Sequence, residues 1–239
     1  ANVATVYWAQ ITPGTDTIGT WRTHSGYNLP VALRGLNLVA YNDFLYAIGG
    51  NSGSGAVNTV YQLHLAPSGE PTPPWTAMTN LPAAVQYTGA AAYENQLYVY
   101  GGQSAAGTTG SNAVYTAPIL PDGTLGSWTT LAQTLPAAIF AHASVQYNGY
   151  LYAIGGNSGG TLRTTTYYAK IKSPGVISSW MTASKSFATA RQSNGGSFAT
   201  VWAGYLYVSG GCSAQSGGIC TTPLSDLQET NINADGSLT

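Results

Sequence analysis

The chain has 239 residues, of which 44% are hydrophobic and only 6% are charged, and its formal net charge at pH 7 is −1. Because disordered chains combine low hydrophobicity with high charge, this composition indicates a folded protein with a polar but uncharged surface. The near-neutral balance argues against nucleic acid or an anionic membrane as partner, and no apolar run approaches the 18 residues of a membrane-spanning helix.

The N-terminal residues predict the second half of a small antiparallel sheet. Asn2–Ile11 is predicted to be a third strand and Gly19–Trp21 the start of a fourth. Four related segments follow, each with a short apolar strand, a polar turn and a second strand of the form Leu-Tyr-x-x-Gly-Gly. The apolar strands are Leu36–Tyr41, Thr88–Tyr93, His142–Tyr147 and Ser197–Trp202, and the Gly-Gly pairs begin at Gly49, Gly101, Gly155 and Gly210.

Further strands complete each unit. Third strands are predicted at Asn58–Leu65, Asn112–Ile119 and Thr165–Ile171, with another near Leu224–Asn233, and a turn then leads to a tryptophan and a short fourth strand. The tryptophans, Trp21, Trp75, Trp128 and Trp180, keep step with the glycine pairs. Four antiparallel strands repeated about every 53 residues, with almost no helix, are typical of a β-propeller blade. The predicted fold class is therefore all-β, a propeller of four-stranded blades.

This order of apolar strand, Leu-Tyr-x-x-Gly-Gly, tyrosine and tryptophan resembles the kelch repeat of galactose-oxidase-like propellers, in the manner of a bacterial surface protein. The resemblance implies one domain over 1–239, with a partial blade at 1–29, blades at 30–80, 81–134 and 135–187, and an incomplete blade at 188–239. Many kelch repeats carry an arginine before the first strand. Here that region has Arg34 and Arg191, but Tyr87 and Phe140 in the middle copies.

The two ends of the chain overlap in phase, because both carry a third strand. Asn233–Thr239 matches Pro121–Trp128 up to the position where tryptophan is expected. Two interpretations follow. The sequence is a piece of a longer array or larger assembly, or it is a closed five-bladed ring with one redundant strand.

The two cysteines flank one glycine-rich loop. Cys212 and Cys220 lack Cys-x-x-Cys spacing and a neighbouring histidine, so a disulfide is expected instead of a metal site, with two free thiols as the alternative. A disulfide indicates an oxidising compartment, and the composition suits an extracellular or cell-surface protein.

No catalytic constellation is evident, so neither a catalytic residue nor a cofactor is predicted. His24, His64 and His142 fall at different phases of the repeat, and only His142, on a first strand, is expected near the central channel of the propeller. The acidic residues fall mostly in turns, where a carboxylate caps its own backbone.

Binding is expected instead in the loops that follow Gly-Gly, because they vary in length on a constant scaffold. Their amides and hydroxyls suit a polar protein or a glycan on a cell surface, which predicts a recognition or adhesion module. The candidate residues are Asn51, Ser52, Gln103, Ser104, Asn157, Ser158 and Gln215. The alternatives are a carbohydrate-active enzyme of the mutarotase or oxidase type, and a structural domain of a surface appendage.

Overall fold

The computed structural model describes residues 2–12, 14–15, 17–104, 109–193, 198–216 and 219–239. Within these ranges the fold is all-β, as predicted, and every strand pairing is antiparallel. The described residues contain one helix, a single 3-10 turn at Ser25–Tyr27. No helix in these ranges is long and apolar enough to cross a membrane.

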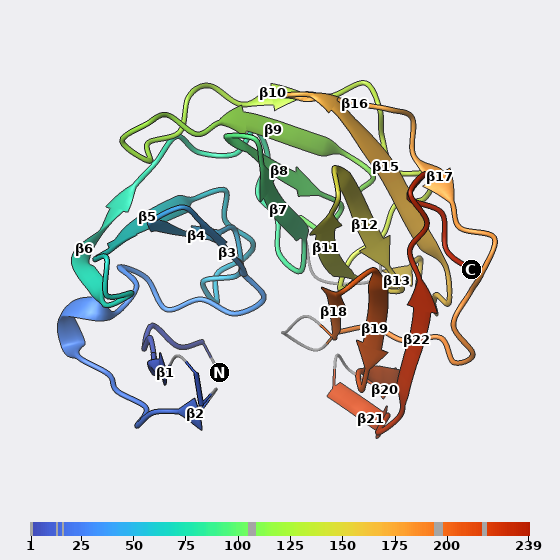
Figure 1. The fold of residues 1–239 in the computed structure, drawn as a ribbon, viewed down its shortest axis with the longest axis horizontal. Helices are drawn as coiled ribbons and strands as arrows, with labels where there is room; N and C mark the ends of the chain where they lie inside the picture. Colours follow the sequence, from blue (N-terminus) through green and yellow to red (C-terminus); the bar gives the residue numbers. More distant parts are fainter. Residues whose placement is uncertain (1, 13, 16, 105–108, 194–197, 217–218) are drawn as a thin grey trace.

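Four larger sheets follow one another along the chain (Figure 1). The first sheet contains β3 (Asn37–Tyr41), β4 (Phe44–Ile48), β5 (Val60–Leu65) and β6 (Pro71–Ala77). The second contains β7 (Gly89–Tyr93), β8 (Gln96–Tyr100), β9 (Val114–Pro118) and β10 (Thr129–Thr130). The third contains β11 (Ala143–Tyr147), β12 (Tyr150–Ile154), β15 (Thr166–Ser173), β16 (Val176–Ile177) and β17 (Met181–Thr182).

The last sheet has three strands, β18 (Ala199–Trp202), β19 (Tyr205–Ser209) and β22 (Leu227–Asn231). Three separate hairpins accompany the four larger sheets. They are β1 (Ile11–Thr12) with β2 (Thr17–Ile18), β13 (Asn157–Ser158) with β14 (Thr161–Leu162), and β20 (Cys212–Ser216) with β21 (Ile219–Pro223). A loop was expected between the cysteines, but Cys212–Ser216 and Ile219–Pro223 pair as strands.

The hydrophobic core lies between consecutive sheets. The inner strands β3, β7, β11 and β18 contact one another in that order, which arranges the sheets along an arc (Figure 1). One apolar cluster joins the first sheet to the second, another joins the second to the third, and one more joins the third to the last. The N-terminal segment covers the free face of the first sheet through Val6, Leu29 and neighbouring side chains.

At the Gly-Gly pairs, the backbone of one sheet closely approaches the segment that enters the next sheet. Gly155 has φ +63° and Gly156 has φ +90°, values that favour glycine because it has no Cβ to clash in a tight turn. The structure adds a second reason. The N–H of Gly156 donates to the carbonyl oxygen of Arg191 in the segment entering the last sheet, at 2.8 Å. A Cβ on Gly155 would lie 2.8 Å from that same oxygen, so a larger residue would push the sheets apart.

The predicted kelch propeller is wrong. The strands form separate sheets of two to five members, and these sheets do not close into a ring. The physical reason is that the Gly-Gly turn and the tryptophan specify how a sheet packs against its neighbour. Such pairwise contacts are satisfied equally well along an open arc, so a period in the sequence does not specify closure.

Candidate functional site

Three of the predicted binding residues directly follow a Gly-Gly pair, and all three are buried. Asn51 is 6% exposed, Gln103 is 4% exposed and Asn157 is fully buried. Each exchanges two backbone hydrogen bonds with the residue that precedes the inner strand of its own sheet, as Asn157 does with Phe140 at 2.8 and 3.0 Å. This pairing fixes the root of each loop and turns the side chain inward.

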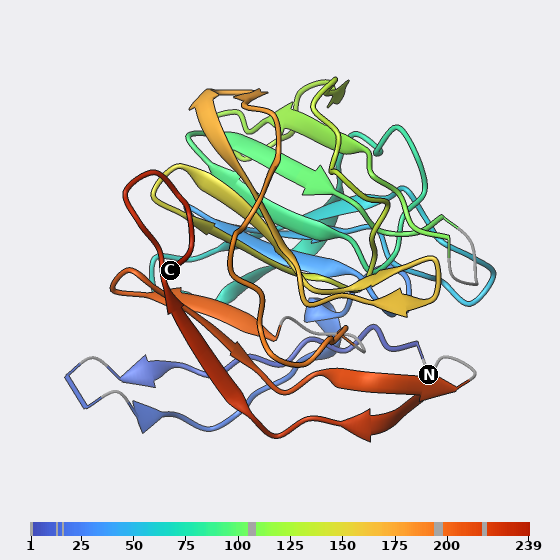
Figure 2. The same ribbon diagram turned by 90° about the vertical axis from the view of Figure 1, so that its right-hand side faces the viewer.

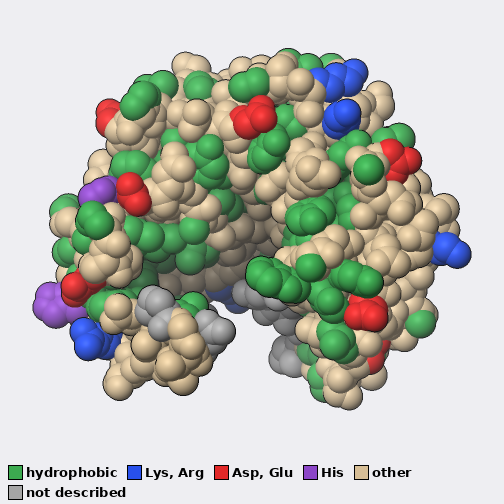
Figure 3. All heavy atoms as spheres, in the orientation of Figure 1, with side chains coloured by type: hydrophobic (Ala, Val, Ile, Leu, Met, Phe, Trp, Pro, Cys, Tyr) green, Lys and Arg blue, Asp and Glu red, His purple; other side chains and the backbone are tan. Residues whose placement is uncertain are grey.

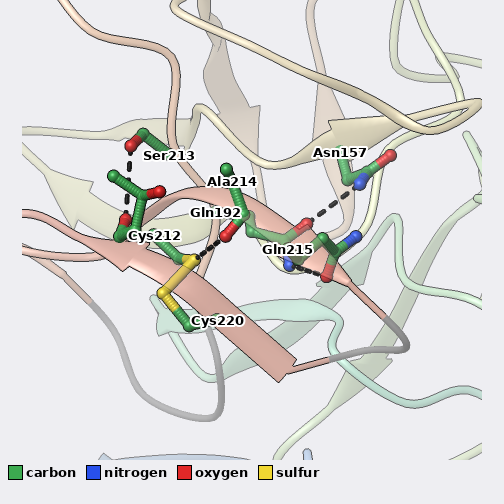
Figure 4. The surroundings of a disulfide bond; sticks show 8 residues. Asn157, Gln192, Cys212, Ser213, Ala214, Gln215 and Cys220 are labelled. Carbon is green, nitrogen blue, oxygen red and sulfur yellow. Dashed lines mark hydrogen bonds between the residues drawn. A yellow bond between two sulfur atoms is a disulfide. The ribbon is translucent and has the colours of Figure 1, made fainter.

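The buried amides connect consecutive sheets. Nδ2 of Asn51 donates to Oε1 of Gln86 at 3.0 Å, and Nδ2 of Asn157 donates to Oε1 of Gln192 at 2.9 Å. Gln192 in turn donates from Nε2 to Oε1 of Gln215 at 2.6 Å, which extends the second link to the β20–β21 hairpin (Figure 4). Asn51, Asn157 and Gln215 were predicted to bind an external partner, and here their side chains form hydrogen bonds within the chain.

The remaining predicted residues lie closer to solvent. Ser52, Ser158 and Gln215 are half-buried, and Ser104 is exposed. The structure therefore does not bring the seven candidates together as one surface. It separates them into an internal layer of amides and an outer layer of small hydroxyl side chains.

The β20–β21 hairpin is closed by the predicted disulfide. Cys212 and Cys220 are bonded, with their Cα atoms 5.7 Å apart (Figure 4). Cys212 is itself held by Gln192, which exchanges two backbone hydrogen bonds with it at 3.0 and 3.1 Å. The hairpin thus combines a covalent clasp with a fixed base. Its exposed side chains are Ala214, Ser216, Thr221, Thr222 and Pro223.

An ion pair joins the segment before the last sheet to the residue that precedes β22. Arg191 is fully buried, and its guanidinium donates to both carboxylate oxygens of Asp226 at 2.9 and 2.7 Å. It also donates to the carbonyl oxygen of Gly210 at 2.8 Å. Hydrogen bonds from Arg191, and from Gln228, lower the pKa of Asp226 to about 2. These contacts fix the Gly-Gly turn from which the disulfide hairpin departs.

The expected position of His142 beside a central channel is wrong, because the side chain is enclosed in the protein. Its side chain is 5% exposed, and among the described residues neither ring nitrogen has a hydrogen-bond partner. Burial lowers the pKa of His142 to about 3, so the ring is neutral at physiological pH. Gly89 and Gly101 make room for it, because a Cβ on either would lie within 3 Å of an imidazole atom.

Charged groups do not converge on one place in the part of the chain that the structure describes. The face in Figure 3 shows few Lys, Arg, Asp and Glu side chains, spread over the surface, while many hydrophobic side chains lie on both sides of the central hollow. No group of three His, Cys, Asp or Glu residues within the described ranges could hold a metal ion. Asp122 and Asp235 accept hydrogen bonds in their own turns, as predicted for turn carboxylates.

Comparison with known proteins assigns no family. No protein-family model matches the chain, and no curated protein matches it. Together with the open arrangement of the sheets, this finding removes the support for the kelch resemblance.

Proposed function

We propose that the chain is an extracellular recognition module that binds a polar protein or a glycan through the loops after its Gly-Gly pairs. The observation that carries the proposal is the anchored hairpin β20–β21. It is clasped by Cys212–Cys220 and tied at its base to Gln192. Pre-organised loops lose less conformational entropy on binding, which favours recognition by a rigid hairpin over a free loop.

The surroundings of the hairpin support a polar partner. The hairpins β13–β14 and β20–β21 lie on the same side of the molecule, away from the C-terminus (Figure 2). Their exposed side chains include Thr161, Ser216 and Thr221, which offer hydroxyl groups without charge. Hydroxyl and amide groups exchange hydrogen bonds with sugars and with polar protein surfaces equally well. The disulfide supports an oxidising, extracellular setting.

A glycan array probed with fluorescently labelled protein tests this function. The double variant Ser216→Arg/Thr221→Arg changes two exposed side chains of the hairpin and should lower binding at least tenfold. The matched control is Ser68→Arg, which places the same side chain in the exposed turn between β5 and β6. Equal loss in both variants, or binding retained by the double variant, would rule out the hairpin as the recognition surface.

A structural role in an assembly is the second candidate, and it has its own observation. The outer face of the last sheet exposes Trp202 to 76% and Leu227 to 66%. Exposed large apolar side chains on one sheet face mark interaction surfaces. Sedimentation velocity separates the candidates, since Trp202→Ser should abolish assembly without changing glycan binding.

A further inference from the structure

His142 lies at the junction between the second and third sheets, and both sheets enclose its side chain. The imidazole fills the space left by Gly89 of β7 and Gly101 after β8, since a Cβ on either glycine would lie within 3 Å of a ring atom. Leu135 and Ile139, which belong to the apolar cluster between these sheets, also lie beside Gly101. A titratable ring is thus part of the packing between two sheets.

The surroundings of this ring contain no charge that could balance a proton. Among the described residues, the other titratable side chain beside it is Tyr100 of β8, with ring centroids 5.7 Å apart. The Tyr100 hydroxyl donates to the carbonyl of Tyr152 at 3.0 Å, and burial raises its pKa, so it stays neutral. Burial alone lowers the pKa of His142, without a contribution from any Asp, Glu, Lys or Arg side chain. A proton on the enclosed ring would therefore create a buried cation without a partner.

The equivalent positions in the first two sheets do not titrate. Leu36 precedes β3 and Thr88 precedes β7, as His142 precedes β11. The hydroxyl of Thr88 is satisfied within its own sheet, because it donates to the carbonyl of Tyr100 at 3.0 Å. The corresponding residue of the last sheet lies outside the described residues. Within the described part of the chain, a histidine at this position is therefore particular to the junction of the second and third sheets.

The backbone at each junction carries the same two hydrogen bonds between sheets. At the junction of the second and third sheets, the N–H of Gly102 donates to the carbonyl of Ile139 at 2.8 Å, and that of Ala141 donates to Tyr87 at 2.7 Å. Ala141 directly precedes His142, so these bonds adjoin the ring. The equivalent donors are Gly50 and Tyr87 between the first and second sheets, and Gly156 and Ser193 between the third and last.

Separation of the second and third sheets would expose the imidazole to water, where it takes up a proton with a pKa near 6.5. The packed junction does not accept that proton, so the ratio of open to closed molecules increases as the pH falls below 6.5. Between pH 7 and pH 5 the increase is about 25-fold. Because the inner strands contact one another in chain order, one junction can open while the others remain packed.

We propose that the junction between the second and third sheets is an acid-sensitive hinge, which opens when His142 takes up a proton and leaves the neighbouring junctions closed. Protonation of a buried histidine is a known means of switching an interface at mildly acidic pH. Opening of the hinge would change the position of the first two sheets relative to the disulfide hairpin. The hinge does not depend on what the loops of the protein bind.

Hydrogen exchange of the intact protein, followed by NMR at pH 7 and pH 5, tests the hinge. The protection factors of the Gly102 and Ala141 amides, which correct for the intrinsic pH dependence of exchange, should fall about 25-fold between these pH values. The amides at the other two junctions should change little; they are those of Gly50, Tyr87, Gly156 and Ser193. An equal fall at all three junctions, or unchanged protection of Gly102 and Ala141, would overturn the proposal.

The matched variant is His142→Leu, which places the side chain of Leu36 in the third sheet. It should keep the protection of Gly102 and Ala141 constant between pH 7 and pH 5, because no group in the junction can then take up a proton. A fall as large as that of the wild type would contradict the role of His142. If the variant does not fold, the comparison of the three junctions in the wild type decides alone.

Discussion

The guanidinium of Arg191 forms two hydrogen bonds with the carboxylate of Asp226, at 2.9 and 2.7 Å, from a fully buried position. The carbonyl of Arg191 accepts the N–H of Gly156, just as Val85 accepts that of Gly50 and Ile139 that of Gly102. The equivalent residues before the second and third sheets, Val85 and Ile139, are apolar, whereas the residue before the last sheet is a buried cation. A buried cation requires a partner, so this sheet depends on Asp226.

Asp226→Asn should therefore destabilise the protein. It leaves Arg191 buried without its counter-charge, which should lower the free energy of unfolding by about 2–3 kcal/mol, less than for a fully buried pair because Asp226 is 36% exposed. Urea denaturation at pH 7 measures the change. Asp43→Asn, in an exposed turn, is the matched control and should cost little; equal effects would show that the pair contributes nothing specific.

The Asp226 carboxylate also predicts that the stability of the protein decreases at acidic pH. The pKa of Asp226 is lowered from 3.8 to about 2 in the folded protein. Its contribution to stability is therefore complete above pH 4 and is lost as the pH falls from about 4 through 2. Denaturation between pH 5 and 2 should show a smaller loss of stability in Asp226→Asn than in the wild type. Parallel curves would contradict the assignment.

His142 predicts a second pH effect, at higher pH. Its pKa is lowered from 6.5 to about 3 on folding. Below pH 6.5 the imidazole is therefore protonated in the unfolded chain but stays neutral in the folded protein. Stability should thus fall below pH 6.5, by about 2 kcal/mol at pH 5. His142→Leu, which copies Leu36 of the first sheet, should remove this loss between pH 8 and 5. A wild-type curve that is flat over this range would contradict the enclosed position of the ring.

Two glycines test the close approach of the sheets. Gly155 and Gly159 have nearly the same φ, +63° and +61°, but only Gly155 has atoms close to where a Cβ would stand. Gly159→Ala should cost about 1 kcal/mol for the left-handed backbone. Gly155→Ala should cost a further 1–3 kcal/mol, roughly, for overpacking against Arg191. Similar melting temperatures for the two variants would mean that the left-handed backbone conformation alone accounts for glycine at Gly155, and that close packing contributes nothing.

The hydroxyl groups of Tyr152 and Tyr207 provide a second matched comparison. Oη of Tyr152 donates to the carbonyl of Gly236 at 3.0 Å in the buried junction with the last sheet. Tyr152→Phe should cost about 1 kcal/mol, since the carbonyl loses its partner. Tyr207 occupies the same place in the last sheet, where within the described residues its hydroxyl has no partner, so Tyr207→Phe should be nearly neutral. Thermal denaturation compares the two variants.

Much of the architecture could be predicted from local patterns. Leu-Tyr-x-x-Gly-Gly located β4, β8, β12 and β19, and the cysteine spacing indicated the disulfide, because both depend on residues close in sequence. Whether the sheets close into a ring could not be predicted, because this depends on the sum of the small rotations between consecutive sheets. The expected strand at Asn2–Ile11 reduces mostly to isolated bridges, such as the one from Trp8 to Arg22.

The site was harder to predict than the fold. Asn51 and Asn157 looked like surface amides because they stand in polar, glycine-rich segments. Their partners Gln86 and Gln192 each lie 35 residues further along the chain. These hydrogen bonds join amides of consecutive sheets, so they can be recognised only once the packing of one sheet on the next is known. Arg191 stood out only as an arginine that precedes a first strand. Its burial and its pairing with Asp226 were not predicted, because an arginine among polar residues is ordinarily a surface residue.

The most direct test of the recognition module is glycan-array binding by Cys212→Ser/Cys220→Ser beside the wild type. Loss of this short disulfide loop should lower the free energy of unfolding by about 2.5 kcal/mol. Both proteins are measured at a temperature where circular dichroism shows them folded. We expect at least a tenfold loss of binding in the variant, because the hairpin is no longer held in place. Unchanged binding would contradict it.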